Sequence, residues 1–211
     1  MKRLVFILCI LFPLTVMGQS DPQAKNYLDK VVATLQKNPI QTDFSALYLN
    51  SATSEKETKT GSLRLKGSKF YFSFSDMEIY FDGKTQWNYL RGANEVTISE
   101  PTGKELQEVN PLLMISDFRK NHKVNFDAED ENDKECRLLN LYPNDIKAQH
   151  FRVLVRVNRS TMQVVKIAIY FKNGTSTTFT TKNYRVVKEL TDADFTFSAE
   201  KYPKVIINDL R

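Results

Sequence analysis

Cysteine, histidine and glycine are scarce in this sequence, and each scarcity excludes a class of function. The 211 residues include two cysteines, two histidines and seven glycines. Cys9 lies near the start of the chain, and Cys136 alone cannot form an internal disulfide in the remainder. Neither His122 nor His150 has a second histidine, a cysteine or a carboxylate at ligand spacing, which argues against a zinc or iron site. The glycines lie mostly at turns and form no loop that could hold a phosphate.

Motifs of catalysis and of nucleic-acid binding are also missing. The sequence has no Gly-x-Ser-x-Gly motif, and no two of its carboxylates are marked as an acid pair. The acidic segment from Glu129 to Asp133 lacks the spacing of a calcium loop, so we expect it at a hairpin tip. The net charge of +5 is mild, without the basic stripe of a nucleic-acid-binding protein. We expect no enzymatic activity, no metal and no cofactor, and a secreted enzyme with an unmarked acid pair stays as an alternative.

The first eighteen residues have the pattern of a secretory signal peptide. Two basic residues precede an apolar run from Leu4 to Leu14, and a cleavage site is expected after Gly18. That run is too short to cross the roughly 30 Å hydrocarbon core of a bilayer. We therefore expect residues 1–18 to be removed and one domain to span residues 19–211.

Two helices are predicted. Residues 21–37 form the clearer one, with Asp21 as its N-cap and Pro22 at its first position. Its apolar residues recur at helical spacing and form one stripe that suits packing on a sheet. A second, short helix is expected to begin at Asn110-Pro111 and to crowd its apolar residues into little more than one turn. That pattern suits a lid over a cavity as well as an ordinary connecting helix.

Most of the remaining chain alternates apolar and polar residues, as strands do. Between Gly61 and Ser99 we expect four or five antiparallel strands, with turns at Asp82-Gly83 and at residues 92–94. Further strands are expected at 40–49, 123–128, 136–142, 151–157, 162–171 and 175–187, and the apolar tail segments 195–197 and 205–207 are expected near the sheet's last edge. The sequence therefore predicts one mostly antiparallel β domain whose large sheet curls.

Asp82-Gly83-Lys84-Thr85 is followed by Trp87 and Tyr89. This block is similar to the DGKT-x-W-x-Y block of the outer-membrane lipoprotein carrier protein (LolA) family, and it is the most specific of several resemblances to that family. The segment GSLRLK at 61–66 is similar to a family strand, and NPLL at 110–113 to a family helix. Where the family has Arg-Pro after the lysine, this chain has Gly67-Ser68.

This resemblance implies a half-open, incomplete antiparallel β-barrel with short lid helices over an apolar cavity. It also implies a monomeric periplasmic carrier that takes acylated lipoproteins from an inner-membrane ABC transporter, shelters their acyl chains and delivers them to the outer membrane, where an acceptor is a further candidate partner. A periplasmic lipid-binding sensor or regulator with the same fold is the alternative. In place of the family's lid-holding arginine, Arg64 or Lys66 is expected to act.

The same faces of the strands would serve as ordinary core if no ligand is bound. If they line a cavity, the ligand-binding residues expected on the sheet are Phe44, Leu65, Phe70, Phe72, Phe74, Phe81, Trp87, Tyr89 and Ile98, and those expected on the underside of the lid are Leu28, Val32, Leu113 and Met114.

Overall fold

The computed structural model describes residues 20–103, 105–106 and 111–211. The expected signal peptide and the expected helix cap Asn110 lie outside these residues. In chain order, the described elements are α1 (Pro22–Lys37), β1 (Ile40–Asn50), β2 (Lys56–Lys66), β3 (Lys69–Phe74), β4 (Met77–Phe81), β5 (Gln86–Leu90), β6 (Glu95–Ser99), α3 (Pro111–Asn121), β7 (His122–Phe126), η1 (Asp130–Asn132), β8 (Cys136–Pro143), β9 (His150–Asn158), β10 (Val164–Phe171), β11 (Thr175–Val186), η2 (Asp192–Phe195), η3 (Ala199–Lys201) and β12 (Ile206–Asp209).

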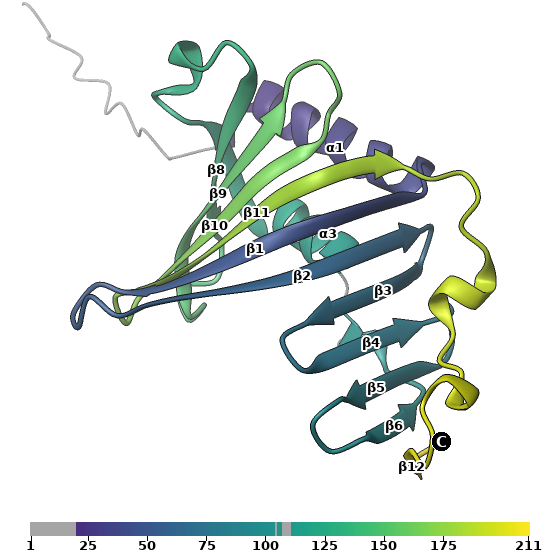
Figure 1. Cartoon of the computed structure of the whole chain (residues 1–211). Helices are drawn as coiled ribbons and strands as arrows, with labels where there is room; N and C mark the ends of the chain where they lie inside the picture. Colours follow the sequence, from purple (N-terminus) through teal and green to yellow (C-terminus); the bar gives the residue numbers. More distant parts are fainter. Residues whose placement is uncertain (1–19, 104, 107–110) are drawn as a thin grey trace, which may run out of the picture.

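The described strands form one 12-stranded sheet in the order β12-β6-β5-β4-β3-β2-β1-β11-β10-β9-β8-β7. Neighbouring strands are antiparallel except for β12, which runs parallel to β6. Figure 1 shows the sheet curling past α1 and α3 without closing, so β12 and β7 stay at its two edges. This confirms the expected mainly β, half-open barrel.

Helix α1 has the predicted start and the predicted buried stripe. The carboxylate of Asp21 accepts the backbone N–H groups of Gln23 and Ala24, at 2.7 and 3.4 Å, which satisfies two of the free donors at the helix start. The side chains that face the sheet are buried, and they are Ala24, Leu28, Val31 and Leu35. The helix ends before Pro39, where the chain turns into β1.

Helix α3 is longer than predicted, because it continues from Pro111 to Asn121. The sequence pattern stopped at Ile115, but Phe118 lies three residues further on and is buried with it. Residues three apart share one helix face, so the second turn extends the same apolar surface. Both helices pack into the main hydrophobic cluster together with the strands.

The connection between β1 and β2 is short, since β1 ends at Asn50 and β2 begins at Lys56, which pairs with Leu49. One turn differs from the sequence prediction. At Asp82-Gly83 a four-residue connection replaces the expected two-residue hairpin turn. There the Asp82 carboxylate accepts the N–H groups of Lys84 and Thr85, and of these residues only Gly83 has a positive φ. The acidic segment 129–133 does lie at the tip between β7 and β8, as predicted.

The C-terminal segment covers the β3–β6 part of the sheet face that α1 and α3 leave free. Phe195 packs against Tyr71 and Leu190, and Phe197 packs against Tyr89 and Val96. The segment 195–197 was expected near the last edge of the sheet, and Phe195 ends the short helix η2, because Thr191 and Asp194 cap that turn reciprocally. Strand β12 then extends the sheet edge beside β6, as the tail pattern predicted.

Among the described residues, none of the helices has the length and apolar character needed to cross a membrane. Within the same ranges, no group of three or more histidine, cysteine or acidic side chains is placed to hold a metal ion.

Candidate functional site

An apolar cavity of about 290 Å³ lies between the sheet and the two helices. Its wall combines strands from both halves of the chain with α1 and α3. The lining residues are Leu35, Ile40, Thr42, Phe44, Leu63, Leu65, Phe72, Met77, Ile79, Met114, Ile115, Val164, Ile167, Phe179, Thr181 and Tyr184. The hydroxyls of Thr42 and Thr181 are both used internally, since they donate to the backbone carbonyls of Lys182 and Val164 at 2.9 Å. The cavity therefore offers a ligand an almost entirely apolar surface.

Stacked phenylalanine rings form one side of this cavity. The Phe44 ring lies parallel to Phe72, with centroids 5.3 Å apart and planes at 13°, and meets the edge of Phe179 at 6.1 Å. Phe74 continues the stack 5.8 Å from Phe44. Three of these rings come from β1 and β3, which are separated by β2, so the strand between them must leave room.

Gly61 of β2 leaves that room. It pairs with Phe44 on one side and with Phe74 on the other. A Cβ atom at this position would lie 2.3 Å from the Phe44 ring and 2.3 Å from the carbonyl oxygen of Ser73. The glycine is therefore required by the close approach of a ring and of the backbone.

The two helices over the cavity are joined to each other by an ion pair. The guanidinium of Arg119 on α3 donates through Nε to Asp29 Oδ1 of α1 and through Nη2 to Oδ2, the latter at 3.0 Å. The hydrogen bond from Arg119 holds the pKa of Asp29 below its usual range. Arg119 and Asp29 are both partly exposed, so this tie is open to solvent.

The structure brings part of the expected binding set to the cavity. Phe44, Leu65, Phe72 and Met114 line it. Leu28, Phe70 and Phe81 are buried in the surrounding core, and Val32 packs on that core from α1. Phe74 does not line the cavity itself, but its ring stacks on that of Phe44. The Leu113 side chain lies outside the described residues.

Trp87, Tyr89 and Ile98 lie on the opposite face of the sheet, which corrects their expected position in the cavity. The pairing of β4 with β5 sets Trp87 opposite Tyr80 and Tyr89 opposite Glu78. Cross-strand partners share a face, and Tyr80 and Glu78 point away from the cavity-lining Ile79. Ile98 pairs with Trp87 across β5 and β6, so it lies on the same face as Trp87. These side chains pack against Phe197 and Tyr202 of the C-terminal segment instead.

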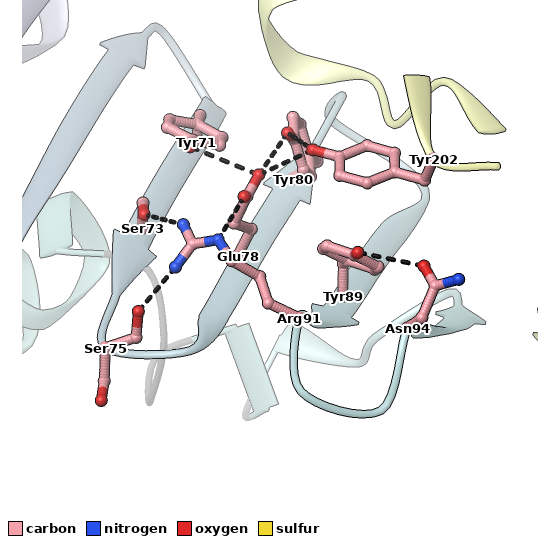
Figure 2. A network of polar contacts seen from close by, with 9 residues as sticks. All are labelled: Tyr71, Ser73, Ser75, Glu78, Tyr80, Tyr89, Arg91, Asn94 and Tyr202. Atoms are coloured by element: carbon pink, nitrogen blue, oxygen red, sulfur yellow. Dashed lines mark hydrogen bonds and ion pairs between the residues drawn. The ribbon is translucent and has the colours of Figure 1, made fainter. Parts of the chain in front are cut away.

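A buried carboxylate organises this opposite face (Figure 2). Glu78 accepts hydrogen bonds from the hydroxyls of Tyr80 at 2.6 Å and Tyr202 at 3.0 Å. It also forms an ion pair with Arg91, whose Nε donates to it at 2.8 Å. Burial raises the pKa of Glu78, but the hydrogen bonds from Tyr80, Arg91 and Tyr202 outweigh it and hold the pKa below its ordinary value. Tyr80, Tyr202 and Arg91 all donate to the ionised carboxylate. The hydrogen bond from Tyr202 therefore holds the C-terminal segment against the sheet.

Arg64 and Lys66 also point to this face, so neither replaces the arginine that holds the lid in the family. Arg64 lies 3.6 Å from Asp194 and over the ring of Tyr71. Lys66 Nζ donates to the carbonyl of Leu190 at 2.5 Å. Both alternate along β2 with Leu63 and Leu65, which line the cavity. The expected contact of these two side chains with the lid is therefore wrong.

Sequence reasoning missed the cavity residues from β10 and β11. The alternation of β10 and β11 was visible in the sequence, but nothing in it indicates that β11 pairs with β1. The cavity residues on these two strands are Val164, Ile167, Phe179 and Tyr184.

Sequence reasoning also missed the contact between the two histidines. His122 and His150 stack with centroids 5.0 Å apart, and their Nε2 atoms share a hydrogen bond of 2.7 Å. Burial, followed by the neighbouring His150, lowers the pKa of His122 to about 4.

Comparisons with known proteins give the following matches. The fold is similar to that of an uncharacterized conserved protein from Thermus thermophilus, with a TM-score of 0.57 and 11% sequence identity over 89% of this chain and 99% of that one. Weaker matches are a putative outer membrane lipoprotein-sorting protein domain from Vibrio parahaemolyticus (TM-score 0.46, 13% identity, 82% of this chain and 96% of that one) and a LolA superfamily protein from Nitrosomonas europaea (TM-score 0.45, 14% identity, 82% and 97%). No curated protein sequence matches this one.

The sequence identity to these structures is too low to assign a family, but a match to a family model does assign one. The model described as "Outer membrane lipoprotein carrier protein LolA" matches residues 14–135, which is more than half of the chain. The matched range includes the phenylalanine wall from β1 and β3, Gly61 and both cavity helices. The chain belongs to the family of the outer membrane lipoprotein carrier protein LolA.

Proposed function

We propose that this protein is a periplasmic carrier that shelters the acyl chains of lipoproteins in the cavity beneath α1 and α3 and moves them from the inner to the outer membrane. The observation that carries the proposal is the apolar cavity itself, lined by a curled sheet and two helices. Moving an acyl chain into such a surface is favourable by about 0.8 kcal/mol for each buried CH₂ group. Membership of the LolA family supports the same reading.

The size of the cavity bears on how cargo enters. At about 290 Å³ it lies just below the roughly 300–1,000 Å³ range of ligand pockets. A lipoprotein anchor with several acyl chains therefore requires α1 and α3 to move away from the sheet. The solvent-exposed ion pair between Arg119 and Asp29 suits helices that move together, because it joins them to each other.

The proposal includes the expected partners and the expected processing. Residues 1–18 act as a signal peptide, and residues 19–211 form the carrier domain. An inner-membrane ABC transporter supplies acylated lipoproteins, and an outer-membrane acceptor receives them. Phe44, Leu65, Phe72 and Met114 contact the acyl chains, and the protein carries its ligand without converting it.

The test is binding of a fluorescent fatty-acid probe by a cavity variant and a matched surface variant. Phe72→Glu places a carboxylate in the apolar wall, and burying that charge is unfavourable. We expect a loss of at least about tenfold in probe affinity, with the far-UV circular dichroism unchanged. Phe151→Glu makes the same change at an exposed position on β9 and should bind the probe as the wild type does. Equal binding by the Phe72 variant would contradict the site.

A second assay separates carriage from sensing. The protein is mixed with inner-membrane vesicles that hold acylated lipoproteins, together with the release machinery. A carrier extracts the lipoprotein into the soluble fraction. If the probe binds but no lipoprotein leaves the membrane, the carrier proposal fails and a lipid-binding sensor remains.

A further inference from the structure

A patch of exposed apolar side chains lies where β8 leads into β9. Ile146, in the connecting loop, is 86% exposed, which is the largest exposure among the big hydrophobic side chains of the described residues. Phe151 at the start of β9 is 49% exposed and Tyr142 near the end of β8 is 39% exposed. None of these side chains belongs to the cavity or to the face covered by the C-terminal segment.

The register of the sheet brings these residues together. Leu141 pairs with Val153 in the core, so Tyr142, the next residue of β8, faces away from it. Phe151 is the extra residue where β9 and β10 shift register, because Tyr170 pairs with Arg152 and Phe171 with His150, and such a bulge turns Phe151 toward the side of Tyr170. The Phe151 ring lies 6.2 Å from that of Tyr170 on β10. Lys172, at the turn after β10, donates from Nζ to the carbonyl of Ile146 at 2.5 Å and so holds the loop against this turn. We call Tyr142, Ile146, Phe151 and Tyr170 the β8–β9 patch.

Positive charge surrounds the β8–β9 patch. Lys123 pairs with Tyr142 across β7 and β8, Lys147 follows Ile146, and Lys172 contacts the loop, and all three lysines are exposed. One carboxylate, Asp145, lies in the same loop and accepts the backbone N–H of Lys147 at 2.8 Å. Arg152 stands over Tyr170 but is paired with Asp127, so it adds little net charge. The rim is therefore basic overall.

We propose that the β8–β9 patch docks on the surface of a bilayer that contains anionic lipids. Ile146 and Phe151 enter the boundary between headgroups and acyl chains, where apolar side chains gain from burial. Tyr142 and Tyr170 lie at headgroup level, which suits rings with one polar end. Lys123, Lys147 and Lys172 face the lipid phosphates, and each basic residue near an anionic surface adds to the attraction. The inference stands on this surface alone and not on the cavity.

The experiment measures co-sedimentation with vesicles of residues 19–211, because the basic and apolar leader of residues 1–18 would bind lipid by itself. One set is made of phosphatidylcholine alone and the other contains about one third phosphatidylglycerol, which supplies an anionic surface. We expect binding to the anionic set that weakens as salt is added, because screening shortens the reach of the lysines. Ile146→Glu and Phe151→Glu should each lower the partition coefficient by about tenfold. Lys123→Gln combined with Lys147→Gln should remove most of the dependence on phosphatidylglycerol.

Two controls make the outcome specific. Ile207→Glu changes an apolar and exposed residue on β12, at the far edge of the sheet, and should bind vesicles as the wild type does. Phe72→Glu should lose the fatty-acid probe but keep vesicle binding, so failure of the cavity and failure of the patch are distinguishable. The proposal is overturned if the wild type ignores anionic vesicles, if it binds both sets equally, or if Ile207→Glu loses as much binding as Ile146→Glu. A further outcome would also overturn the proposal: the wild type does not bind vesicles, but the patch variants lose lipoprotein transfer. The β8–β9 patch would then dock on a protein and not on a bilayer.

Discussion

Arg119 on α3 and Asp29 on α1 form a two-point ion pair that joins the helices on the cavity side of the sheet. The helices are separated in sequence by the first six strands, yet this pair and their shared apolar surface make them one unit. Both side chains are partly exposed, so the pair adds orientation more than stability. The resemblance to the family implied that a basic side chain on a strand holds the lid helices. In this structure the described contacts instead hold α1 and α3 to each other.

Removing this ion pair should speed ligand exchange with little effect on stability. Arg119→Met keeps most of the side-chain bulk and is expected to lower the free energy of unfolding by only about 0.5 kcal/mol. The release rate of a fatty-acid probe should rise, because α1 and α3 can then separate independently. Stopped-flow displacement of the probe measures this rate. Lys69→Met breaks an exposed ion pair with Asp192 and is the matched control. Equal release rates for both variants would show that the tie does not limit opening.

Gly61→Ala should destabilise the protein by about 1–3 kcal/mol, since the new methyl group would overlap the Phe44 ring and the Ser73 carbonyl. The phenylalanine wall should be displaced as well, so probe affinity is expected to fall with stability. Urea unfolding and probe titration check the two effects. Gly92→Ala is the control, because a Cβ there has no neighbour within 4 Å. A neutral result at Gly61 would refute the close approach described for β1 and β2.

The single tryptophan reports on the register of the β4–β5 hairpin. Because Trp87 lies on the face opposite the cavity, its emission maximum should not move when a fatty acid binds. A Trp87→Phe, Phe179→Trp double variant moves the fluorophore into the cavity wall, and its emission should shift on binding. A response from Trp87 in the wild type would mean that the hairpin register differs by one residue.

The stacked histidines predict a loss of stability in mild acid. Burial, with the neighbouring His150, lowers the pKa of His122 to about 4 from an ordinary 6.5, and burial also lowers the pKa of His150. Below pH 6.5 the unfolded chain therefore binds protons that the folded protein does not. Stability is complete above that value and falls on acidification towards pH 4. Asp117 opposes this shift at both rings, and Lys172 reinforces it at His150.

The free energy of unfolding should drop by about 2 kcal/mol between pH 6.5 and pH 5 through His122 alone. Carboxylates with lowered pKa values act at more acidic pH, because their ordinary values are 3.8 and 4.5. Urea titrations at several pH values measure the slope, and His122→Gln should flatten it. An unchanged slope in that variant would exclude His122 as its cause.

The fold followed from the sequence where signals were local. Asp21 and Pro22 fix the start of α1, and alternation fixes the strands from Leu63 to Ile98. The faces were harder, because alternation shows which side chains share a side of one strand but not which side of the sheet it is. Trp87 was therefore placed in the cavity, although its pairing with Tyr80 sets it outside. The contributions of Phe179 and Tyr184 depend on the long-range pairing of β1 with β11, which no local pattern encodes.

The most direct test of the carrier proposal is native mass spectrometry of the full chain purified from the envelope of its own host. The account predicts an acylated lipoprotein bound to the wild type and absent from Phe72→Glu. It predicts that Ile207→Glu retains this cargo, because this exposed residue on β12 lies outside both the cavity and the β8–β9 patch. A wild-type protein free of lipoprotein, or a Phe72 variant with undiminished cargo, would contradict the account.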